Sequence, residues 1–171
     1  MNDDPDRVDE IAALWGRERP DLDVSPVQVI GRLHRLGAAL TEQLVTLYAR
    51  YGLSEGEFDV LATLRRGGGP CALRPAELAR LTMVTTGGIT KRLDRLEAAG
   101  LVVRSPDGGG DARAKLAVLT ERGRALIDEA FAAHVANEHR LLAPVPEPDR
   151  EELRRILKSW HQGIASMEAS G

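Results

Sequence analysis

The 171-residue chain has one cysteine and lacks any long apolar run. The single cysteine, Cys71, argues against a framework of disulfide bonds. No apolar stretch approaches the roughly 20 residues that cross a bilayer, and the acidic N-terminal segment lacks the basic start of a signal peptide. We therefore expect a cytoplasmic protein with no membrane partner.

The sequence also lacks the residue clusters of an enzyme or a metalloprotein. Its histidines are scattered, and two of them, His134 and His139, fall on different sides of one predicted helix. The glycine runs at 67–69 and 108–110 end a helix and form a hairpin tip, so neither follows a strand as a nucleotide-binding loop does. We expect no catalytic site, no metal and no cofactor.

Positive charge is scarce in the chain as a whole but is concentrated in one segment. The net charge is −3, whereas residues 74–115 hold eight Lys or Arg and five Asp or Glu, a net of +3. The remainder of the chain therefore carries −6. A positive segment on an acidic body presents one face to phosphate, which favours a nucleic-acid partner for that segment.

Residues 75–120 are predicted to fold as a short helix, a turn, a second helix and a two-stranded ribbon. Pro75 suits the first position of a helix, and apolar residues follow it at helical spacing. The second helix has an apolar stripe formed by Ile89, Leu93 and Leu96. This order of elements is that of a winged helix-turn-helix, a unit that reads DNA.

The second helix carries small polar residues on the face away from its apolar stripe. Thr85 or Thr86 can cap its start. Hydroxyl and ammonium groups on such a slim helix can meet phosphates or base edges in a major groove about 12 Å wide. We expect the residues of this helix that contact DNA to be Thr85, Thr86, Gly88, Thr90, Lys91 and Arg95. A solvated helix face is the alternative for this helix taken alone.

The ribbon is predicted from strands at 101–104 and 115–119, joined through a flexible glycine-rich tip. Asp111 and Arg113 flank that tip. A carboxylate beside the arginine would hold it for insertion into a minor groove, so Asp111, Arg113 and Lys115 complete the predicted DNA-binding set. An ordinary surface ion pair between Asp111 and Arg113 is the alternative.

The string Asp-Ala-Arg-Ala-Lys-Leu-Ala-Val-Leu-Thr at 111–120, followed by Gly123, resembles the wing signature of MarR-type transcription regulators. The run at 78–102 resembles the segment that precedes the wing in that family. The resemblance extends over nearly the whole chain. It implies a mainly α fold with a small β-wing, in which a winged helix-turn-helix domain is carried by a helical dimerisation platform. Ala112 departs from the pattern, which often has an arginine there, while Arg113 keeps the minor-groove role that the family implies.

Helices are predicted on both sides of this module. They are expected at about 5–18, at 27–51, after a capping box of Ser54 and Glu57, at 120–142, and from Asp149 onward. A chain of this size has few other elements to cover the apolar faces of the terminal helices. Association with a second subunit is therefore the natural way to bury them, with packing inside one chain as the alternative.

We divide the chain into three predicted regions. Residues 1–52 form the N-terminal part of a dimerisation platform, residues 53–120 form the DNA-binding domain, and residues 121–171 supply C-terminal dimerisation helices. MarR-type regulators pair through their first and last helices, so the resemblance also implies a homodimer. A two-fold dimer would place two recognition helices on half-sites about one turn apart in a pseudo-palindromic operator of double-stranded DNA.

An extra N-terminal helix with Trp15 resembles the urate-responsive branch of the MarR family. The resemblance implies an effector role for Trp15, Asp59 and Arg92, with Arg65 as a weaker candidate. Arg92 lies roughly 65° from the centre of the apolar stripe of its helix, where its guanidinium needs a partner. Asp59 could supply that partner, and an anionic ligand could then compete for Arg92 and move the helix. A permanent ion pair, with Trp15 in an ordinary core, is the alternative.

We therefore expect a repressor that binds operator DNA as a homodimer and is released by a small anion. Urate-like purines lead on resemblance, and small polycarboxylates are the alternative, although only an aromatic ligand would stack on Trp15. Two other functions stay open. One is redox-responsive regulation through Cys71, and the other is a winged-helix module that binds protein instead of DNA.

Overall fold

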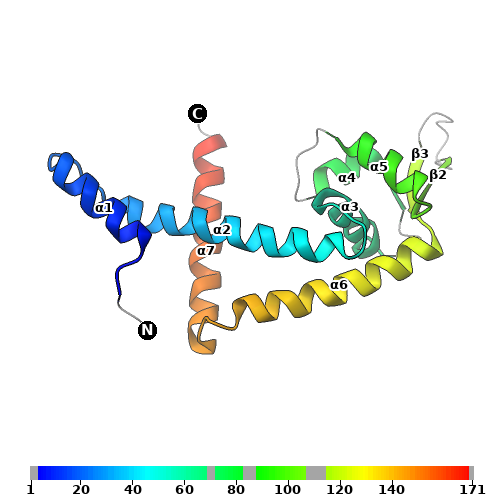
Figure 1. Ribbon diagram of the computed structural model, residues 1–171. Helices are drawn as coiled ribbons and strands as arrows, with labels where there is room; N and C mark the ends of the chain where they lie inside the picture. The colour runs from blue at the N-terminus through cyan, green and yellow to red at the C-terminus, as the bar shows by residue number, and fades with distance from the viewer. Residues whose placement is uncertain (1–3, 69–71, 83–87, 107–114, 170–171) are drawn as a thin grey trace. The chain divides into compact units, whose positions relative to one another are not determined.

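The structure is a computed structural model, which describes residues 4–68, 72–82, 88–106 and 115–169. It is mainly helical with a small antiparallel sheet, as predicted (Figure 1). In chain order the described elements are α1 (Arg7–Glu18), α2 (Ser25–Ala49), α3 (Glu55–Arg66), β1 (Ala72–Leu73), α4 (Pro75–Leu81), α5 (Ile89–Ala98), β2 (Val102–Pro106), β3 (Lys115–Leu119), α6 (Glu121–Leu142) and α7 (Glu147–Ala169). The chain divides into two compact units, residues 1–133 and 134–171, with the boundary inside α6.

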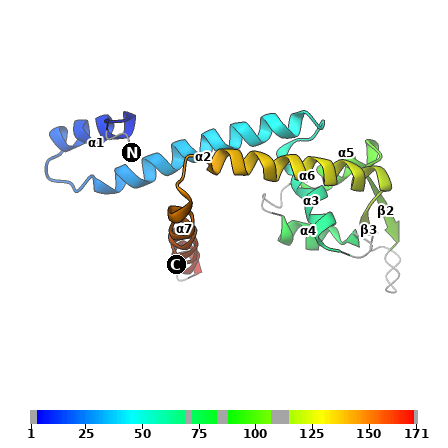
Figure 2. The ribbon, with the colours of Figure 1, turned by 90° about the horizontal axis from the view of Figure 1, so that it is seen from below.

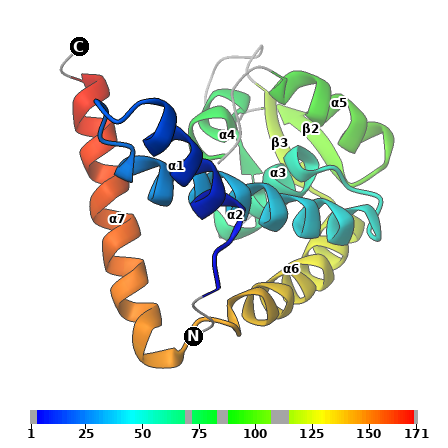
Figure 3. The same ribbon diagram turned by 60° about the vertical axis from the view of Figure 1, so that its left-hand side comes forward.

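Helices α3, α4 and α5 and the three strands form a winged helix-turn-helix within the first unit (Figure 3). The strand order is β1-β3-β2, and both pairings are antiparallel. Helix α3 lies at the centre, because it contacts α4, α5 and β3. Its apolar side chains join those of α4, α5 and the sheet in one core that includes Leu61, Leu64, Leu78, Leu93, Leu96 and Val102. This core fixes α5 relative to the wing.

Helix α3 begins where the sequence predicts, because Ser54 and Glu57 form a capping box. The Glu57 carboxylate accepts a hydrogen bond from the Ser54 backbone N–H at 2.9 Å, and the Ser54 hydroxyl accepts one from the Glu57 N–H. Tyr48, near the end of α2, stacks on Phe58 with ring centroids 4.0 Å apart. The capped start of α3 is thereby anchored to the long helix α2.

Helix α1 packs along the first half of α2 (Figure 2). Val8 is buried against Gly31, where an added Cβ would lie 3.1 Å from a Val8 methyl carbon. Arg32 of α2 pairs with Asp6 at 2.9 Å and with Asp9 at 2.7 Å. The hydrogen bond from Arg32 is the main cause of the lowered pKa of Asp9. An apolar contact and an ionic cluster therefore attach α1 to α2.

Both units carry large apolar side chains on their surfaces. In α1, the following loop and the first half of α2 these are Leu14, Trp15, Leu22, Val29, Ile30, Leu33 and Leu36, and in α7 they are Leu153, Ile156, Leu157, Ile164 and Met167. Those of α7 recur at three- and four-residue steps, so they lie on one face of that helix. Among the described residues, no helix is both long enough and apolar enough to cross a bilayer.

Several sequence-based details need correction. Strand β1 was not predicted, since two residues give no periodic signal. Strand β2 continues to Pro106, so part of the predicted hairpin tip is strand, and α7 begins at Glu147 rather than Asp149. Trp15 is 53% exposed in the single chain, which rules out an ordinary core position within that chain.

Candidate nucleic-acid interface

Helix α5 presents the predicted polar face. Thr90, Lys91 and Arg95 are exposed, as is Asp94, whereas the apolar stripe on the opposite side is buried. The other predicted DNA contacts Thr85, Thr86, Asp111 and Arg113 lie outside the described residues, as does the side chain of Lys115. The described part of the candidate interface is therefore the exposed surface of α5.

The start of α5 differs from the prediction. The N-cap residue is Gly88, with φ 128°, whereas the predicted caps Thr85 and Thr86 lie outside the described residues. The carbonyl of Gly88 accepts a hydrogen bond from the backbone N–H of Arg92 at 2.9 Å. A φ of this value strains any residue with a Cβ, so glycine sets the direction in which the chain enters α5.

Arg95 ties α5 to the first turn of α3. Its Nε lies 2.7 Å from Oε1 of Glu57, whose side chain is only 12% exposed. Burial raises the pKa of the Glu57 carboxyl, but hydrogen bonds from Ser54 and the charge of Arg95 outweigh that effect and hold the pKa below its usual value. Glu57 therefore serves two purposes, because it caps α3 and it holds the recognition helix.

Arg104 of β2 ties the other side of α5 to the wing. Its guanidinium lies 2.5 Å from Oδ1 of Asp94 and 3.2 Å from Oε2 of Glu97. The backbone N–H of Arg104 also donates a hydrogen bond to Glu97. One guanidinium thus lies beside two carboxylates at the edge of the exposed face of α5 and compensates part of their negative charge. Arg104 was not among the residues predicted from the sequence. A cation in a strand gives no signal of its partners, which lie seven and ten residues earlier.

Two of the predicted effector residues lie on packed neighbouring helices. Asp59 is on α3 and Arg92 is on α5, and both are half-buried. The Arg92 side chain lies over Gly56, one turn before Asp59 on α3. The Asp59 carboxylate accepts a hydrogen bond from the Thr63 hydroxyl at 3.5 Å. The structure thus places the arginine on the first turn of α3, in the vicinity where an acidic partner was predicted.

The other two effector candidates lie elsewhere. Arg65 pairs with Asp128 of α6, with Nε 2.6 Å from Oδ1, so it connects α3 to α6. Trp15 belongs to α1, whose principal contacts are with α2. The Trp15 ring is therefore not placed beside Arg92 by the main packing contacts of a single chain.

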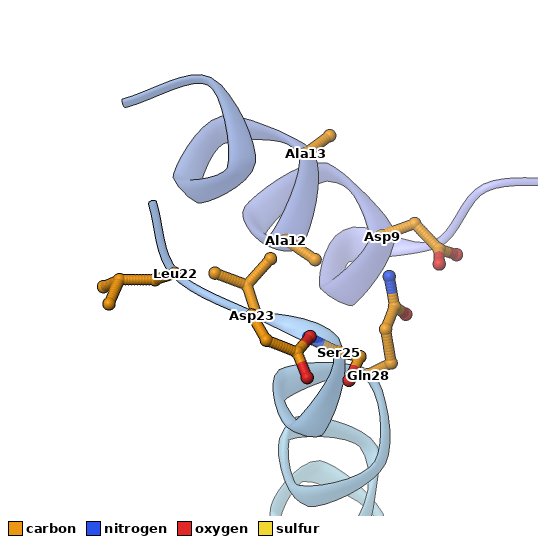
Figure 4. Close-up of a pocket in the computed structure, with 8 residues that line it drawn as sticks. Asp9, Ala12, Ala13, Leu22, Asp23, Ser25 and Gln28 are labelled. Atoms are coloured by element: carbon orange, nitrogen blue, oxygen red, sulfur yellow. The ribbon is translucent and has the colours of Figure 1, made fainter. Parts of the chain in front are cut away.

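A surface hollow between α1 and the start of α2 contains none of the predicted effector residues (Figure 4). Asp9, Ala12 and Gln28 border it from the two helices, and Asp23 borders it from the loop between them. Its carboxylates are already engaged, because Asp9 binds Arg32 and Asp23 accepts a hydrogen bond from the backbone of Ser25. The hollow offers no cation to an anionic ligand among the residues that border it.

The fold and the exposed face of α5 define a winged helix-turn-helix protein, the class that includes many transcription regulators. The MarR family sequence profile matches residues 51–114. The regulator PecS of Dickeya dadantii, named an HTH-type transcriptional regulator, is 43% identical over 150 residues, which cover 88% of this chain and 90% of PecS. The chain therefore belongs to the MarR family of transcription regulators.

Solved structures agree with this assignment. AbsC, a MarR family transcriptional regulator from Streptomyces coelicolor, has a TM-score of 0.71 and 27% identity, covering 83% of this chain and 96% of AbsC. Rv2887 of Mycobacterium tuberculosis has a TM-score of 0.59 and 36% identity, covering 75% of this chain and 95% of that protein. That structure is a complex with p-aminosalicylic acid. The names of these relatives indicate a transcription regulator rather than an enzyme.

Proposed function

We propose that this protein is a homodimeric repressor that binds a pseudo-palindromic operator and is released by a small anion. The observation that carries the proposal is the position of α5. Its exposed face offers Thr90 and Lys91 to DNA, while Arg92 and Arg95 reach back to the first turn of α3. A ligand that engages an arginine on the inner side of the recognition helix would act directly on the position of its outer side.

Dimer formation is supported by the exposed apolar side chains. In α7 the apolar face includes Ile156, Leu157 and Ile164, and in α2 it includes Leu33 and Leu36. Such faces are usually covered in a stable protein, and a second copy of the chain is the partner that symmetry favours. We propose that the regions 1–52 and 121–171 supply the dimerisation surface, on either side of a DNA-binding domain at 53–120.

The effector is proposed to be a small anion that competes for Arg92. Asp59 lies one turn after Gly56, the residue of α3 against which the Arg92 side chain packs, and is the proposed acidic partner of Arg92. We retain urate-like purines as the leading class, with small polycarboxylates second. The complex of Rv2887 with p-aminosalicylic acid, an aromatic carboxylate, supports an anionic aromatic ligand. Trp15, which is exposed in one chain, is proposed to contribute a stacking surface in the dimer.

Arg65 is a weaker candidate for the effector site, because its guanidinium is paired with Asp128. An Arg65→Ala variant is therefore expected to keep the effector response, whereas Arg92→Ala is expected to lose most of it. This pair of variants separates a general loss of positive charge from a role specific to Arg92.

A mobility-shift titration on the DNA upstream of the gene tests the proposal as a whole. Tight binding that weakens steeply with salt is expected, together with release by urate or by citrate. Binding no stronger than to random DNA of the same length, in every ligand state, would contradict the operator role. A response to oxidant, lost in Cys71→Ser, would instead favour redox regulation.

A further inference from the structure

Gly56 lies in the first turn of α3 and is buried beneath the side chain of Arg92. A Cβ added there would lie 2.7 Å from Cζ and 3.0 Å from Cδ of Arg92, and closer still to its Nε. Atoms do not approach so closely, so the arginine occupies space that exists only because residue 56 has no side chain. The backbone of Gly56 does not have a positive φ, which means that space, not chain flexibility, is what glycine provides here.

We propose that Gly56 forms a seat that positions Arg92, and that this seat determines both operator affinity and the response to the anion. The inference rests on the proposed function and identifies Gly56 as the residue that sets the position of Arg92 in the proposed effector site. Glu57, the next residue, holds Arg95 one turn further along α5. The first turn of α3 therefore contacts α5 at two successive turns, once where the Arg92 side chain packs on Gly56 and once through the ion pair of Glu57 with Arg95.

The seat is coupled to the start of the recognition helix. The backbone N–H of Arg92 donates to the Gly88 carbonyl in the first turn of α5. A Cβ on Gly88 would also lie 4.0 Å from Cζ of Arg92, so the guanidinium lies close to the entry of the helix. An anion that draws Arg92 off Gly56 removes one of the contacts between this end of α5 and α3, in addition to the apolar core. The opposite side of the helix is still held by Arg104.

Gly56→Ala is a selective test, because it moves the arginine without removing its charge. The atoms in the way belong to the flexible end of a side chain, so the variant is expected to fold with Arg92 displaced. Gly67→Ala is the matched control, since Gly67 is an exposed glycine at the end of the same helix, and an added Cβ there would meet no atom closer than 3.4 Å. Arg92→Ala and the double variant Gly56→Ala/Arg92→Ala complete the set.

Operator affinity and release by urate and by citrate are measured for each protein by fluorescence anisotropy. We expect Gly56→Ala to weaken operator binding at least fivefold and to shift the anion concentration for half-release at least fivefold. Added to Arg92→Ala, which is itself expected to lose most of the anion response, the same change is expected to alter operator affinity by no more than twofold. The proposed role of Gly56 is overturned if Gly56→Ala matches the parent and Gly67→Ala in both measurements, or if its effect on operator affinity is equally large without Arg92.

A thermal-unfolding cycle tests the seat without DNA or ligand. Alanine at position 56 favours the helix, but in the parent it must also displace Arg92. Gly56→Ala is therefore expected to give a Tm change that is less favourable by a few °C in the parent than in the Arg92→Ala background. Equal changes in the two backgrounds would reject the seat. A parent that binds no operator, or that no anion releases, would reject the proposed function while leaving this comparison decisive.

Discussion

A single carboxylate, Glu57, links the stability of α3 to the position of the recognition helix. Its Oε2 accepts hydrogen bonds from Ser54 and its Oε1 accepts one from Arg95. Both partners favour the ionised form, which agrees with the lowered pKa of this group. At the scale of one residue, the placement of α5, the proposed DNA-binding helix, thus depends on the charge of Glu57.

We expect Glu57→Gln to lower the free energy of unfolding by about 0.5–1 kcal/mol at pH 7, because glutamine keeps the cap but loses the ion pair. A group whose pKa is lowered by folding stabilises the protein above its unfolded pKa of about 4.3, and that contribution is lost as pH falls through the folded value. Urea unfolding of both proteins between pH 3 and pH 7 should therefore give curves that converge at low pH. Glu55→Gln, an exposed change in the same turn, is the control, and a gap that widens at low pH would contradict the assignment.

Gly88 provides a second test at the residue scale. Because its φ of 128° is unfavourable for a side chain, Gly88→Ala is expected to cost about 1–3 kcal/mol in the free energy of unfolding. Gly37→Ala, in an exposed stretch of α2, is expected to stabilise the protein by up to about 1 kcal/mol. Denaturant unfolding measures both changes. Equal stability of the two variants would mean that α5 starts in another conformation.

At the scale of the elements, α5 is held from two sides. Arg95 connects it to α3, and Arg104 connects it to β2 of the wing. The Arg104 guanidinium is directed at carboxylates and its side chain is 26% exposed, so it acts on α5 rather than on phosphate. The helix and the wing are therefore expected to approach DNA as one rigid surface.

Removal of Arg104 tests this coupling. Arg104→Ala leaves Asp94 and Glu97 uncompensated beside DNA, so we expect operator affinity to fall about tenfold. Asp94→Asn in the same chain should restore part of the loss. Lys91→Ala is expected to reduce the slope of the logarithm of the binding constant against the logarithm of salt concentration by about one. Arg104→Ala should change that slope little.

Anisotropy titrations across salt concentrations measure both effects. Arg7→Ala removes an arginine from an exposed pair with Glu10 on α1 and serves as the control. An unchanged affinity in Arg104→Ala, or a slope that falls as much as in Lys91→Ala, would show that Arg104 does not position α5.

The elements also show how far the sequence alone can predict this protein. Helix α3 was placed correctly because its cap, Ser54 with Glu57, is a local signal that needs no tertiary context. Strand β1 was missed because it forms only by pairing with β3, where Ala72 lies opposite Val118. For α5 the predicted caps Thr85 and Thr86 lie outside the described residues, and the N-cap residue is Gly88, whose positive φ gives no side-chain signal in the sequence.

The candidate site was predicted less completely than the fold. The outward face of α5 and the half-buried position of Arg92 follow from helical periodicity, and both are confirmed. The pairs of Arg95 with Glu57 and of Arg65 with Asp128 join residues far apart in the sequence. Such partners are chosen by packing, which no local pattern records. The role of Gly56 is of the same kind, because a missing side chain is meaningful only once its neighbour is known.

At the scale of the whole molecule, large apolar side chains are exposed on the described surface of both units. Helix α7 carries exposed Leu153, Ile156, Leu157, Ile164 and Met167 on one face, and α1 and α2 carry further exposed apolar side chains. Burial of apolar surface stabilises association by roughly 25 cal/mol per Å², so a face of this kind favours a dimer. A dimer would in turn present two α5 helices to one operator.

Ile156→Glu is expected to convert the protein to a monomer, because it places a charge on the α7 apolar face. The monomer should bind a single half-site weakly and lose at least tenfold in affinity for the full operator. In the dimer, binding of one subunit to its half-site holds the other subunit close to the second half-site, and the monomer lacks this advantage. Light scattering coupled to gel filtration measures the mass, and anisotropy measures binding. Lys158→Gln on the same helix changes the net charge by the same amount away from this face, so it should remain dimeric. If Ile156→Glu is dimeric and binds the operator as the parent does, the α7 face has no part in the dimer.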